Sequence, residues 1–425
     1  MIDINPHTPP FSIPLDEIKP LPPAPAAFRP IIHKPVLKVL GLGGGGSNAI
    51  NRMIELGIEG VEFIAANTDI QALNRSLASK KVQLGPKCTR GLGAGGNPMV
   101  GQAAAEESEA DIRAALQGAD MVFLTAGMGG GTGTGSIPVA ARISRELGAV
   151  TIAIVTTPFS FERGRRQTNA RNGLAQLRPN TDTLITIPNE RLLFIAPRDL
   201  PLEVAFSMAD DVLRQAVQGI TELITEAGLI NVDFAHVRHI MKLGGGALMS
   251  IGHGQGDDKA FKAVEQALHH PLLETASLTN AEGILVNFTS GEDLTIFEVE
   301  TAVNHLKDQT GSDVEIVMGV TRDDRLMDRA QVILIVTGLG APSLEDTLPG
   351  LLAPRHSAAA VPSHGTTGEL VPAEPVRRSI DLQTPLSALP SLLQPSDPAP
   401  QAFQADSSFT LSSDLDLPAF LRQAK

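Results

Sequence analysis

Two glycine-rich runs in this sequence have the composition and the setting of phosphate-binding loops. The first runs from Gly41 to Asn48 and the second from Gly127 to Gly135. Each follows a short apolar stretch typical of a buried strand and precedes a helical pattern. Backbone N–H groups at a helix N-terminus, together with the positive end of the helix dipole, favour an anion at such a point. Two glycine-rich nests on neighbouring strand ends therefore suit a polyphosphate better than a single pyrophosphate.

Taken alone, the first run is also compatible with a dinucleotide-binding site. Its Gly-x-Gly-x-x-Gly spacing also fits that fingerprint, and Asp69 falls near the acidic position expected at the end of the second strand. An NAD-dependent oxidoreductase would leave the second run unexplained, and the sequence has no Gly-x-x-x-x-Gly-Lys-Ser/Thr motif. A glycine turn that only packs a helix tightly on a strand is the structural alternative.

Short apolar stretches alternating with helical patterns predict the fold around these runs. This alternation implies a parallel sheet wrapped by helices. A long helix is expected where Leu213, Val217, Ile220 and Ile224 recur at helical spacing. Beyond it, three strand patterns predict a second sheet in a smaller α+β domain hinged on that helix. The expected strands are residues 36–40, 61–66, 121–125, 150–155, 183–187, 283–288, 315–318 and 332–337, and a first helix is expected at about residues 49–56.

Composition and charge narrow the class of protein. A net charge of −13 without a basic stripe argues against duplex nucleic acid as a partner, and the absence of Trp and Tyr argues against a base-stacking surface. The single cysteine, Cys88, rules out an intramolecular disulfide and a multi-thiolate metal site. No apolar stretch approaches the roughly 18 to 20 residues that span a bilayer, and the proline-rich start does not resemble a secretory signal. We therefore expect a cytoplasmic protein without direct membrane insertion and without nucleic acid.

The second glycine run carries a resemblance to a known family. Residues 129–135, Gly-Gly-Gly-Thr-Gly-Thr-Gly, resemble the sequence that marks the tubulin and FtsZ superfamily. The resemblance to the bacterial cell-division FtsZ family covers roughly residues 36–340 and the last dozen residues. It implies a GTPase that binds GTP or GDP and polymerises head to tail into a ring at the mid-cell division site. Similar segments follow in the family's order at residues 43–48, 67–69, 91–98, 158–162, 185–189 and 231–234.

The resemblance and the composition together predict the domain organisation. The family fold is a Rossmann-like parallel-sheet GTPase domain, a central helix and a smaller α+β activation domain. Proline-rich composition predicts disorder on both sides of that globular part. The expected boundaries are a disordered extension at 1–35, a GTP-binding domain at 36–203, the central helix at 204–230, the activation domain at 231–340, a disordered linker at 341–411 and a partner-binding peptide at 412–425.

The nucleotide site implied by the resemblance draws on several segments. The two glycine runs hold the phosphates, and residues 93–95 lie beside the γ-phosphate. Asp210 matches the position that reads guanine. The residues implied as nucleotide-binding are Gly44, Gly45, Gly46, Ser47, Asn48, Asp69, Gly93, Ala94, Gly95, Gly131, Thr132, Gly133, Glu162, Arg166, Asn189 and Asp210.

For the charged residues of this set, the sequence allows both a nucleotide-binding role and a purely structural role. A carboxylate at Asp210 can accept hydrogen bonds from both N1–H and N2–H of guanine, which adenine does not offer. Asp210, expected at the start of the long helix, could instead cap that helix. Glu162 and Arg166 match the pair that the family uses near the ribose and phosphates. Because they are four residues apart, they could instead form a surface ion pair.

The loop that completes hydrolysis departs from the family pattern. The resemblance implies that Asn231, Asp233 and a second aspartate enter the nucleotide pocket of the next subunit, where they position the attacking water or a cation, expected to be Mg²⁺. His236 stands where that second aspartate is expected. Neutral imidazole can take a proton from water but attracts a hard cation poorly. We expect slower hydrolysis, with near-normal and negligible rates as the alternatives.

Two further expectations concern partners. Residues 412–425 resemble the family's C-terminal peptide, which docks on membrane-tethering and regulatory division proteins. Its apolar anchors are Leu415, Leu417, Phe420 and Leu421. His236 also supports a second hypothesis, in which the chain is a hydrolysis-impaired regulator that co-assembles with an active paralogue.

Overall fold

The computed structural model describes residues 34–339, except 163, 198, 226–227, 231, 274–277, 279–280 and 311–313. All of these belong to one compact unit of the chain, residues 1–349. The expectations for the N-terminal extension, for Asn231 and for the linker and tail lie outside the described residues, and the domain boundaries stay predictions.

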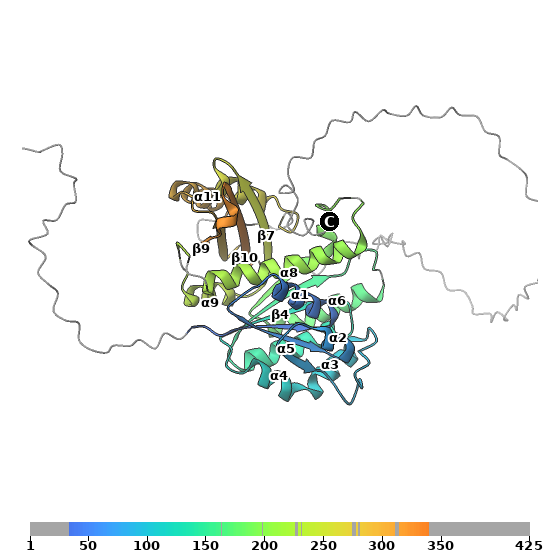
Figure 1. The fold of residues 1–425 in the computed structure, drawn as a ribbon. Helices are drawn as coiled ribbons and strands as arrows, with labels where there is room; N and C mark the ends of the chain where they lie inside the picture. The colour runs from blue at the N-terminus through green and yellow to red at the C-terminus, as the bar shows by residue number, and fades with distance from the viewer. Residues whose placement is uncertain are drawn as a thin grey trace, which may run out of the picture. The chain divides into compact units, whose positions relative to one another are not determined.

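One mixed sheet organises the described residues (Figure 1). Its strand order is β3-β2-β1-β4-β5-β6-β7-β10-β8-β9. The strands from β3 to β7 run parallel, β10 lies antiparallel between β7 and β8, and β9 is parallel to β8. The bounds are β1 (Leu37–Leu42), β2 (Val61–Asn67), β3 (Lys80–Gln83), β4 (Met121–Gly127), β5 (Val150–Thr157), β6 (Thr183–Pro188), β7 (Gly246–Gln255), β8 (Gly283–Ser290), β9 (Glu315–Arg322) and β10 (Arg329–Thr337).

Helices cover both faces of the parallel part of the sheet. The helices α1 and α8 pack together on one face, and α3 to α6 pack on the other. The smaller domain carries α10 and α11 on its strands. The bounds are α1 (Gly43–Glu55), α2 (Ile70–Arg75), α3 (Pro98–Glu107), α4 (Glu109–Leu116), α5 (Thr132–Glu146), α6 (Arg165–Leu177), α7 (Asn189–Leu192), α8 (Leu202–Thr225), α9 (Phe234–Lys242), α10 (Lys259–Leu268) and α11 (Ile296–Gln309).

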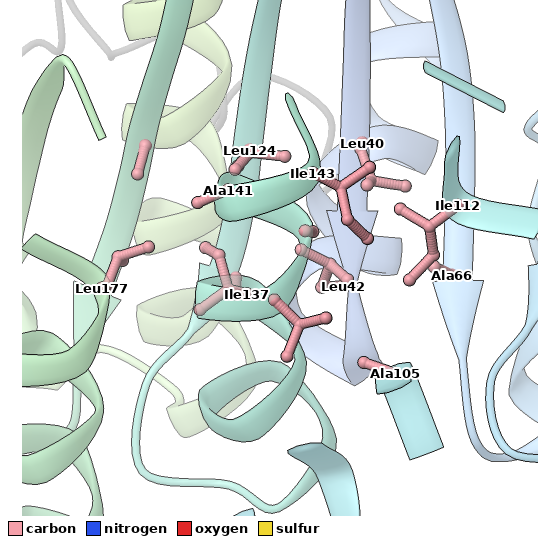
Figure 2. Close-up of a cluster of buried hydrophobic side chains, with 14 of the residues drawn as sticks. Leu40, Leu42, Ala66, Ala105, Ile112, Leu124, Ile137, Ala141, Ile143 and Leu177 are labelled. Carbon is pink, nitrogen blue, oxygen red and sulfur yellow. The ribbon is translucent and has the colours of Figure 1, made fainter. Parts of the chain in front are cut away.

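A buried apolar cluster fixes these helices on the sheet. Figure 2 shows Leu40 and Leu42 of β1 and Leu124 of β4 meeting Ile137 and Ile143 of α5. Residues two apart on a strand share a face, which is why Leu40 and Leu42 both contribute. Each fully buried Leu or Ile side chain contributes about 1.5–3 kcal/mol of transfer free energy. The cluster packs α5 against β1 and β4. It therefore fixes the positions at which α1 and α5 begin, because these helices follow β1 and β4.

The smaller domain joins the large sheet through β7, a strand that the sequence analysis missed. β7 pairs with β6 through two residue pairs and with β10 along most of its length. The predicted second sheet is therefore continuous with the first in strand order. Glycines hid this strand from the pattern, since glycine is depleted in strands. At Gly252 glycine is required, because an added Cβ would lie 1.9 Å from the carbonyl oxygen of Ala263 in α10.

The long helix α8 lies between the two parts of the fold (Figure 1). It packs against α1 on one side. On the other side a Cβ added to Gly219 would lie 2.7 Å from the Ile333 side chain of β10. Its 24 residues extend for about 36 Å.

The predicted fold class, a parallel-sheet domain with a long helix and a smaller α+β domain, is confirmed. The eight expected strands form, and β3 and β7 were missed. The start of the first helix was predicted wrongly, because α1 begins at Gly43 and its glycines form helical turns instead of a preceding loop. No helix in the described part of the chain has the length and apolarity that a membrane span requires.

Candidate functional site

Most of the first glycine run forms the first turns of α1, which follows β1, whereas the second run spans the end of β4, a turn at residues 128–131 and the first turn of α5. β1 and β4 are neighbouring strands. These turns approach so closely that only glycine fits. A Cβ added to Gly43 would lie 2.7 Å from the backbone nitrogen of Gly133, and one added to Gly45 would lie 3.1 Å from that of Gly127. The first-turn N–H groups of a helix have no partner within it. Two helix N-termini thus open side by side at the carboxyl edge of the sheet, a setting for an anion.

Residues 91–97 form a third loop against the second glycine run. A Cβ added to Gly131 would lie 2.9 Å from the Cβ atom of Ala94. The backbone nitrogen of Gly93 donates to the carbonyl oxygen of Thr68 at 3.2 Å, and the hydroxyl oxygens of Thr68 and Thr132 are 2.6 Å apart. The structure therefore brings residues of the 93–95 segment, the second run and the end of β2 together.

Asp69 lies beside this loop, with its Cβ atom 3.9 Å from a Cβ added to Gly93. One oxygen of its carboxylate caps α2, because Oδ1 accepts from the backbone nitrogens of Gln71 at 2.8 Å and Ala72 at 3.2 Å. This cap stabilises the helix N-terminus. Asp69 is therefore a structural residue whatever else it binds.

Asn169 is a residue that the sequence analysis missed. On α6, its Nδ2 atom donates to the carbonyl oxygens of Gly96 at 3.1 Å and Gly129 at 3.2 Å. One side chain thus ties the 91–97 loop to the second glycine run. A single sequence carries no signal for it, because its partners are backbone atoms that only the fold brings together.

A second group of candidate residues lies after β6 and on α8. Asn189 begins α7 and is 5% exposed, and its Oδ1 atom has no hydrogen-bond partner among the described residues. Asp210 lies in the third turn of α8, eight residues after Leu202. The prediction that it stands at the helix start, and with it the alternative of a helix cap, is therefore wrong.

Phe206 lies one turn before Asp210 on α8 and was also missed. Its ring meets Phe159 edge to face with centroids 5.4 Å apart, and Phe159 stacks on Phe161 at 5.1 Å. Phe206 keeps 38% of its surface exposed. An aromatic face beside a carboxylate suits a purine base, which can stack and donate at once. The sequence could have indicated Phe206, because residues four apart on a helix lie on the same face and Phe206 is four residues from Asp210.

The electrostatics of Asp210 are unusual for a carboxylate. Burial raises the pKa of Asp210 to about 7, while Arg52 opposes this rise and Asp211 adds to it. Asp211 is bound to Arg214 at 2.7 Å, whereas Asp210 has no hydrogen-bond partner in the described part of the chain. Because this pKa lies above that of an unfolded aspartate, ionised Asp210 costs the protein stability as the pH rises towards 7. A bound donor would offset that cost.

Glu162 and Arg166 form the ion pair that their spacing allows. Glu162 also accepts from the backbone nitrogen of Phe159 at 3.0 Å, and its side chain is largely buried, whereas Arg166 is exposed. The backbone of Arg166 lies against the second glycine run, since a Cβ added to Gly129 would be 2.9 Å from the Arg166 carbonyl oxygen. The ion pair therefore borders the glycine turns, and the two interpretations of these residues are compatible.

The described residues of the loop that was predicted to complete hydrolysis lie beyond the far end of α8. Asp233 caps α9, with Oδ1 accepting from the backbone nitrogen of Ala235 at 3.3 Å, and His236 follows in the first turn. Both side chains are exposed. Figure 1 shows α9 at one end of α8 and α2 and α6 towards the other. From Asp210 to Thr225 alone, α8 advances about 23 Å.

Unpaired polar atoms test whether these residues fit a nucleotide. Ser47 Oγ, Thr125 Oγ1 and Asn189 Oδ1 are buried without a hydrogen-bond partner among the described residues. Such atoms are costly unless a ligand or water satisfies them, so the site fits a polar ligand. Within the same residues, no three His, Cys, Asp or Glu side chains gather to hold a metal ion. A Mg²⁺ ion here would depend on phosphate oxygens.

Comparison with known proteins agrees with this geometry. Residues 36–197 match the model of the Tubulin/FtsZ family, GTPase domain, and residues 245–340 match that of the FtsZ family, C-terminal domain. An empty FtsZ dimer from M. jannaschii is 46% identical, with a TM-score of 0.71 over 74% of this chain and 92% of that one. A tryptophan-to-tyrosine mutant of FtsZ from the same organism is 47% identical, with a TM-score of 0.69 over 72% and 91%.

A more distant structure shares the fold alone. CetZ2 from Haloferax volcanii, described as a GTPγS-bound protofilament, is 20% identical. Its TM-score is 0.60, over 72% of this chain and 93% of that one.

The raised pKa of Asp210 predicts how the affinity for GDP depends on pH. Guanine donates two hydrogens and needs the ionised carboxylate, so the affinity should fall roughly tenfold between pH 7.5 and 6. Isothermal titration with GDP measures this. Asp210→Asn is the control, since it keeps the titration of the GDP phosphates and removes that of the carboxylate. An equal pH dependence in both proteins would contradict the prediction.

Proposed function

The chain belongs to the tubulin/FtsZ family, and we propose that it is a GTP-dependent cytoskeletal protein that forms the ring at a bacterial division site, in the cytoplasm. Head-to-tail copies of the chain build the filament, and GTP is hydrolysed where two copies meet. The observation that carries this proposal is the pair of glycine turns at neighbouring strand ends, in contact at Gly43 and Gly133.

Nucleotide binding follows from the residues around these turns. Gly44–Asn48 and Gly131–Gly133 cradle the polyphosphate, and Gly93–Gly95 lie beside its last phosphate. Glu162 and Arg166 border the phosphates and ribose. Asp210 accepts from guanine, Asn189 offers its unpaired Oδ1 atom, and Phe206 stacks on the base. Asp69 supports the phosphate end while it caps α2.

Hydrolysis needs a second copy of the chain. Asp233 and His236 are exposed beyond the end of α8 that is remote from Asp210. These residues therefore belong to the pocket of the next subunit, where Asn231 would join them. Exposed apolar side chains near the loop, such as Leu229 at 69% exposure, suit a contact between copies. Assembly and GTP turnover are thereby coupled.

His236 reduces the rate of this hydrolysis. A family aspartate at this position would bring a fixed negative charge and a hard oxygen ligand, and phosphoryl transfer depends on positioning and electrostatics. Imidazole offers nitrogen instead. Mg²⁺ supplies charge neutralisation on the phosphates when it is bound, and this chain's contribution at His236 is then limited to positioning water or accepting its proton.

A second candidate function rests on the same residue. A chain with impaired hydrolysis could act as a regulator that co-assembles with an active paralogue. Family membership gives no support to the NAD-dependent oxidoreductase, because both matching models describe FtsZ or tubulin/FtsZ domains.

The proposed assembly predicts that the full chain sediments with GTP and remains in the supernatant with GDP or ATP. Leu229→Glu should abolish sedimentation with GTP and leave GDP affinity within about twofold of the original, because the change places a charge at the contact and not in the pocket. Leu56→Glu is the matched control, an exposed leucine at the far end of α1. Sedimentation of Leu229→Glu with GTP would refute the contact.

Replacing His236 tests the hydrolysis step. His236→Asp should raise GTP turnover by about tenfold, because it restores an acidic pair where charge develops in the transition state. His236→Asn, which lacks both the charge and the base, should stay slow. Phosphate release and sedimentation are followed in parallel. If His236→Asp lowers turnover while assembly persists, His236 is a working base.

The tail is proposed to recruit the filament to the membrane through division proteins that bind residues 412–425. Deleting this segment should leave GTP-driven sedimentation unchanged and abolish the ring of a fluorescently labelled chain in cells. The linker's reach of roughly 45 Å lets the peptide bind without strain on the filament. Deleting residues 398–411, a linker piece of equal length, is the control. Loss of sedimentation in the tail deletion would show that the tail belongs to the core.

A further inference from the structure

The side chain of Asn169 joins two segments of the proposed phosphate site. Its Nδ2 atom carries two hydrogens, and both are donated to backbone oxygens. The acceptors are the carbonyl oxygen of Gly96 at 3.1 Å and that of Gly129 at 3.2 Å. This half-buried amide therefore bridges the 91–97 loop and the second glycine turn, residues 128–131.

The 91–97 loop needs support because it is rich in glycine. Glycine loses more backbone freedom on ordering than any other residue, so a glycine-rich loop is mobile unless other groups hold it. The first part of this loop is held by the end of β2 and by α2. The backbone nitrogen of Gly93 donates to Thr68 at 3.2 Å, and that of Ile70 donates to Gly91 at 3.1 Å.

The second part of the loop has fewer hydrogen bonds to its surroundings. The backbone nitrogen of Asn97 donates to the carbonyl oxygen of Ala94 at 3.0 Å, which closes the loop on itself. Ala94 also packs on the second glycine turn, since a Cβ added to Gly131 would lie 2.9 Å from its Cβ atom. Among the described residues, only the Asn169 amide links this part of the loop to the turn by hydrogen bonds.

The second glycine turn has supports of its own. The backbone nitrogen of Gly129 donates to the hydroxyl oxygen of Thr134 at 2.8 Å. The start of α6 lies directly against the turn, because a Cβ added to Gly129 would lie 2.9 Å from the Arg166 carbonyl oxygen. Removing the Asn169 amide therefore frees the loop and leaves the turn in place.

The packing of α6 fixes the position of Asn169. Ala170 and Leu174 of this helix belong to the buried apolar cluster. A Cβ added to Gly173 would lie 2.4 Å from the Thr134 methyl group, so α6 approaches the first turn of α5 closely. Gly173 is four residues from Asn169 and lies on the same face of the helix. The amide is therefore a donor held at a fixed place beside the turn.

We propose that Asn169 is a positioning residue that holds the 91–97 loop in the shape that receives the last phosphate of GTP. This inference rests on the proposed function, in which residues 93–95 lie beside that phosphate. A loop that is ordered in advance costs less to immobilise when the ligand binds. GDP lacks the last phosphate and gains nothing from the ordered loop. Asn169 thus contributes to a preference of the chain for GTP over GDP.

Nucleotide affinities of the full-length chain test this role. Asn169→Ala should weaken the binding of GTPγS about tenfold and that of GDP by about twofold at most, because the lost hydrogen bonds support the loop. Isothermal titration of the nucleotide-free protein, below the concentration at which it sediments, measures both. Asn172→Ala is the matched control. It removes the same kind of side chain from an exposed position on α6 and should leave both affinities unchanged.

A second variant separates hydrogen bonding from packing. Asn169→Leu nearly keeps the shape of the side chain and removes both donors, so its affinities should match those of Asn169→Ala. Hydrogen exchange measures the loop directly. Both variants should accelerate exchange of the Asn97 amide at least tenfold and leave exchange in Val150–Thr157 unchanged, since this strand lies in the core.

The outcomes distinguish this inference from the proposed function. Equal effects of Asn169→Ala on GTPγS and GDP, the original GTPγS affinity in Asn169→Leu, or unchanged exchange at Asn97 would each overturn the inference alone. Equal affinity of the unchanged chain for GTP and ATP would overturn the proposed function, and the role of Asn169 with it.

Discussion

The candidate site depends on the direct contact of two helix N-termini. A Cβ added to Gly43 at the start of α1 would lie 2.7 Å from the backbone nitrogen of Gly133 at the start of α5, and one added to Gly133 would lie 3.1 Å from the carbonyl oxygen of Leu42 at the end of β1. This contact is possible because β1 and β4 are neighbours in register, so that both helices begin at the same level of the sheet. The apolar cluster beneath α5 fixes the position of this helix on the sheet. Together the two glycine turns offer N–H groups from two sides, which suits a polyphosphate.

The helix α8 imposes the second constraint, since it separates the proposed nucleotide-binding residues from the proposed catalytic residues. Asp210 and Phe206 lie in its first three turns, and the loop that leads to Asp233 follows its end. A helix of this length keeps Asp233 and His236 away from the glycine turns of the same subunit. In the proposed filament the catalytic arrangement would be complete only between copies, which would make assembly a condition of turnover. Because α8 separates the two groups of residues, the proposed site residues do not form one cluster of titratable groups within the subunit.

The sequence predicted much of this arrangement, and the failures have physical causes. Strands with continuous apolar runs, such as Val150–Thr157, were found because buried parallel strands carry that signal. β7 was missed because its glycines, required by the close approach of α10, remove the pattern. Both glycine runs were recognised, but the helical conformation of Gly43–Gly46 was not, because glycine gives no helix signal. Asn169 has backbone partners that no sequence pattern indicates.

The position of His236 shows why the fold accepts a histidine where the family resemblance implies an aspartate. The N-terminus of α9 is capped by Asp233, so this helix does not depend on the residue three positions later. The His236 side chain is exposed and makes no hydrogen bond within the described residues. Nothing in the single subunit therefore selects between histidine and aspartate there. In the proposed filament, selection at this position would act where the side chain meets the phosphates of a neighbouring copy, and a histidine there would change the hydrolysis step without changing the structure of the subunit.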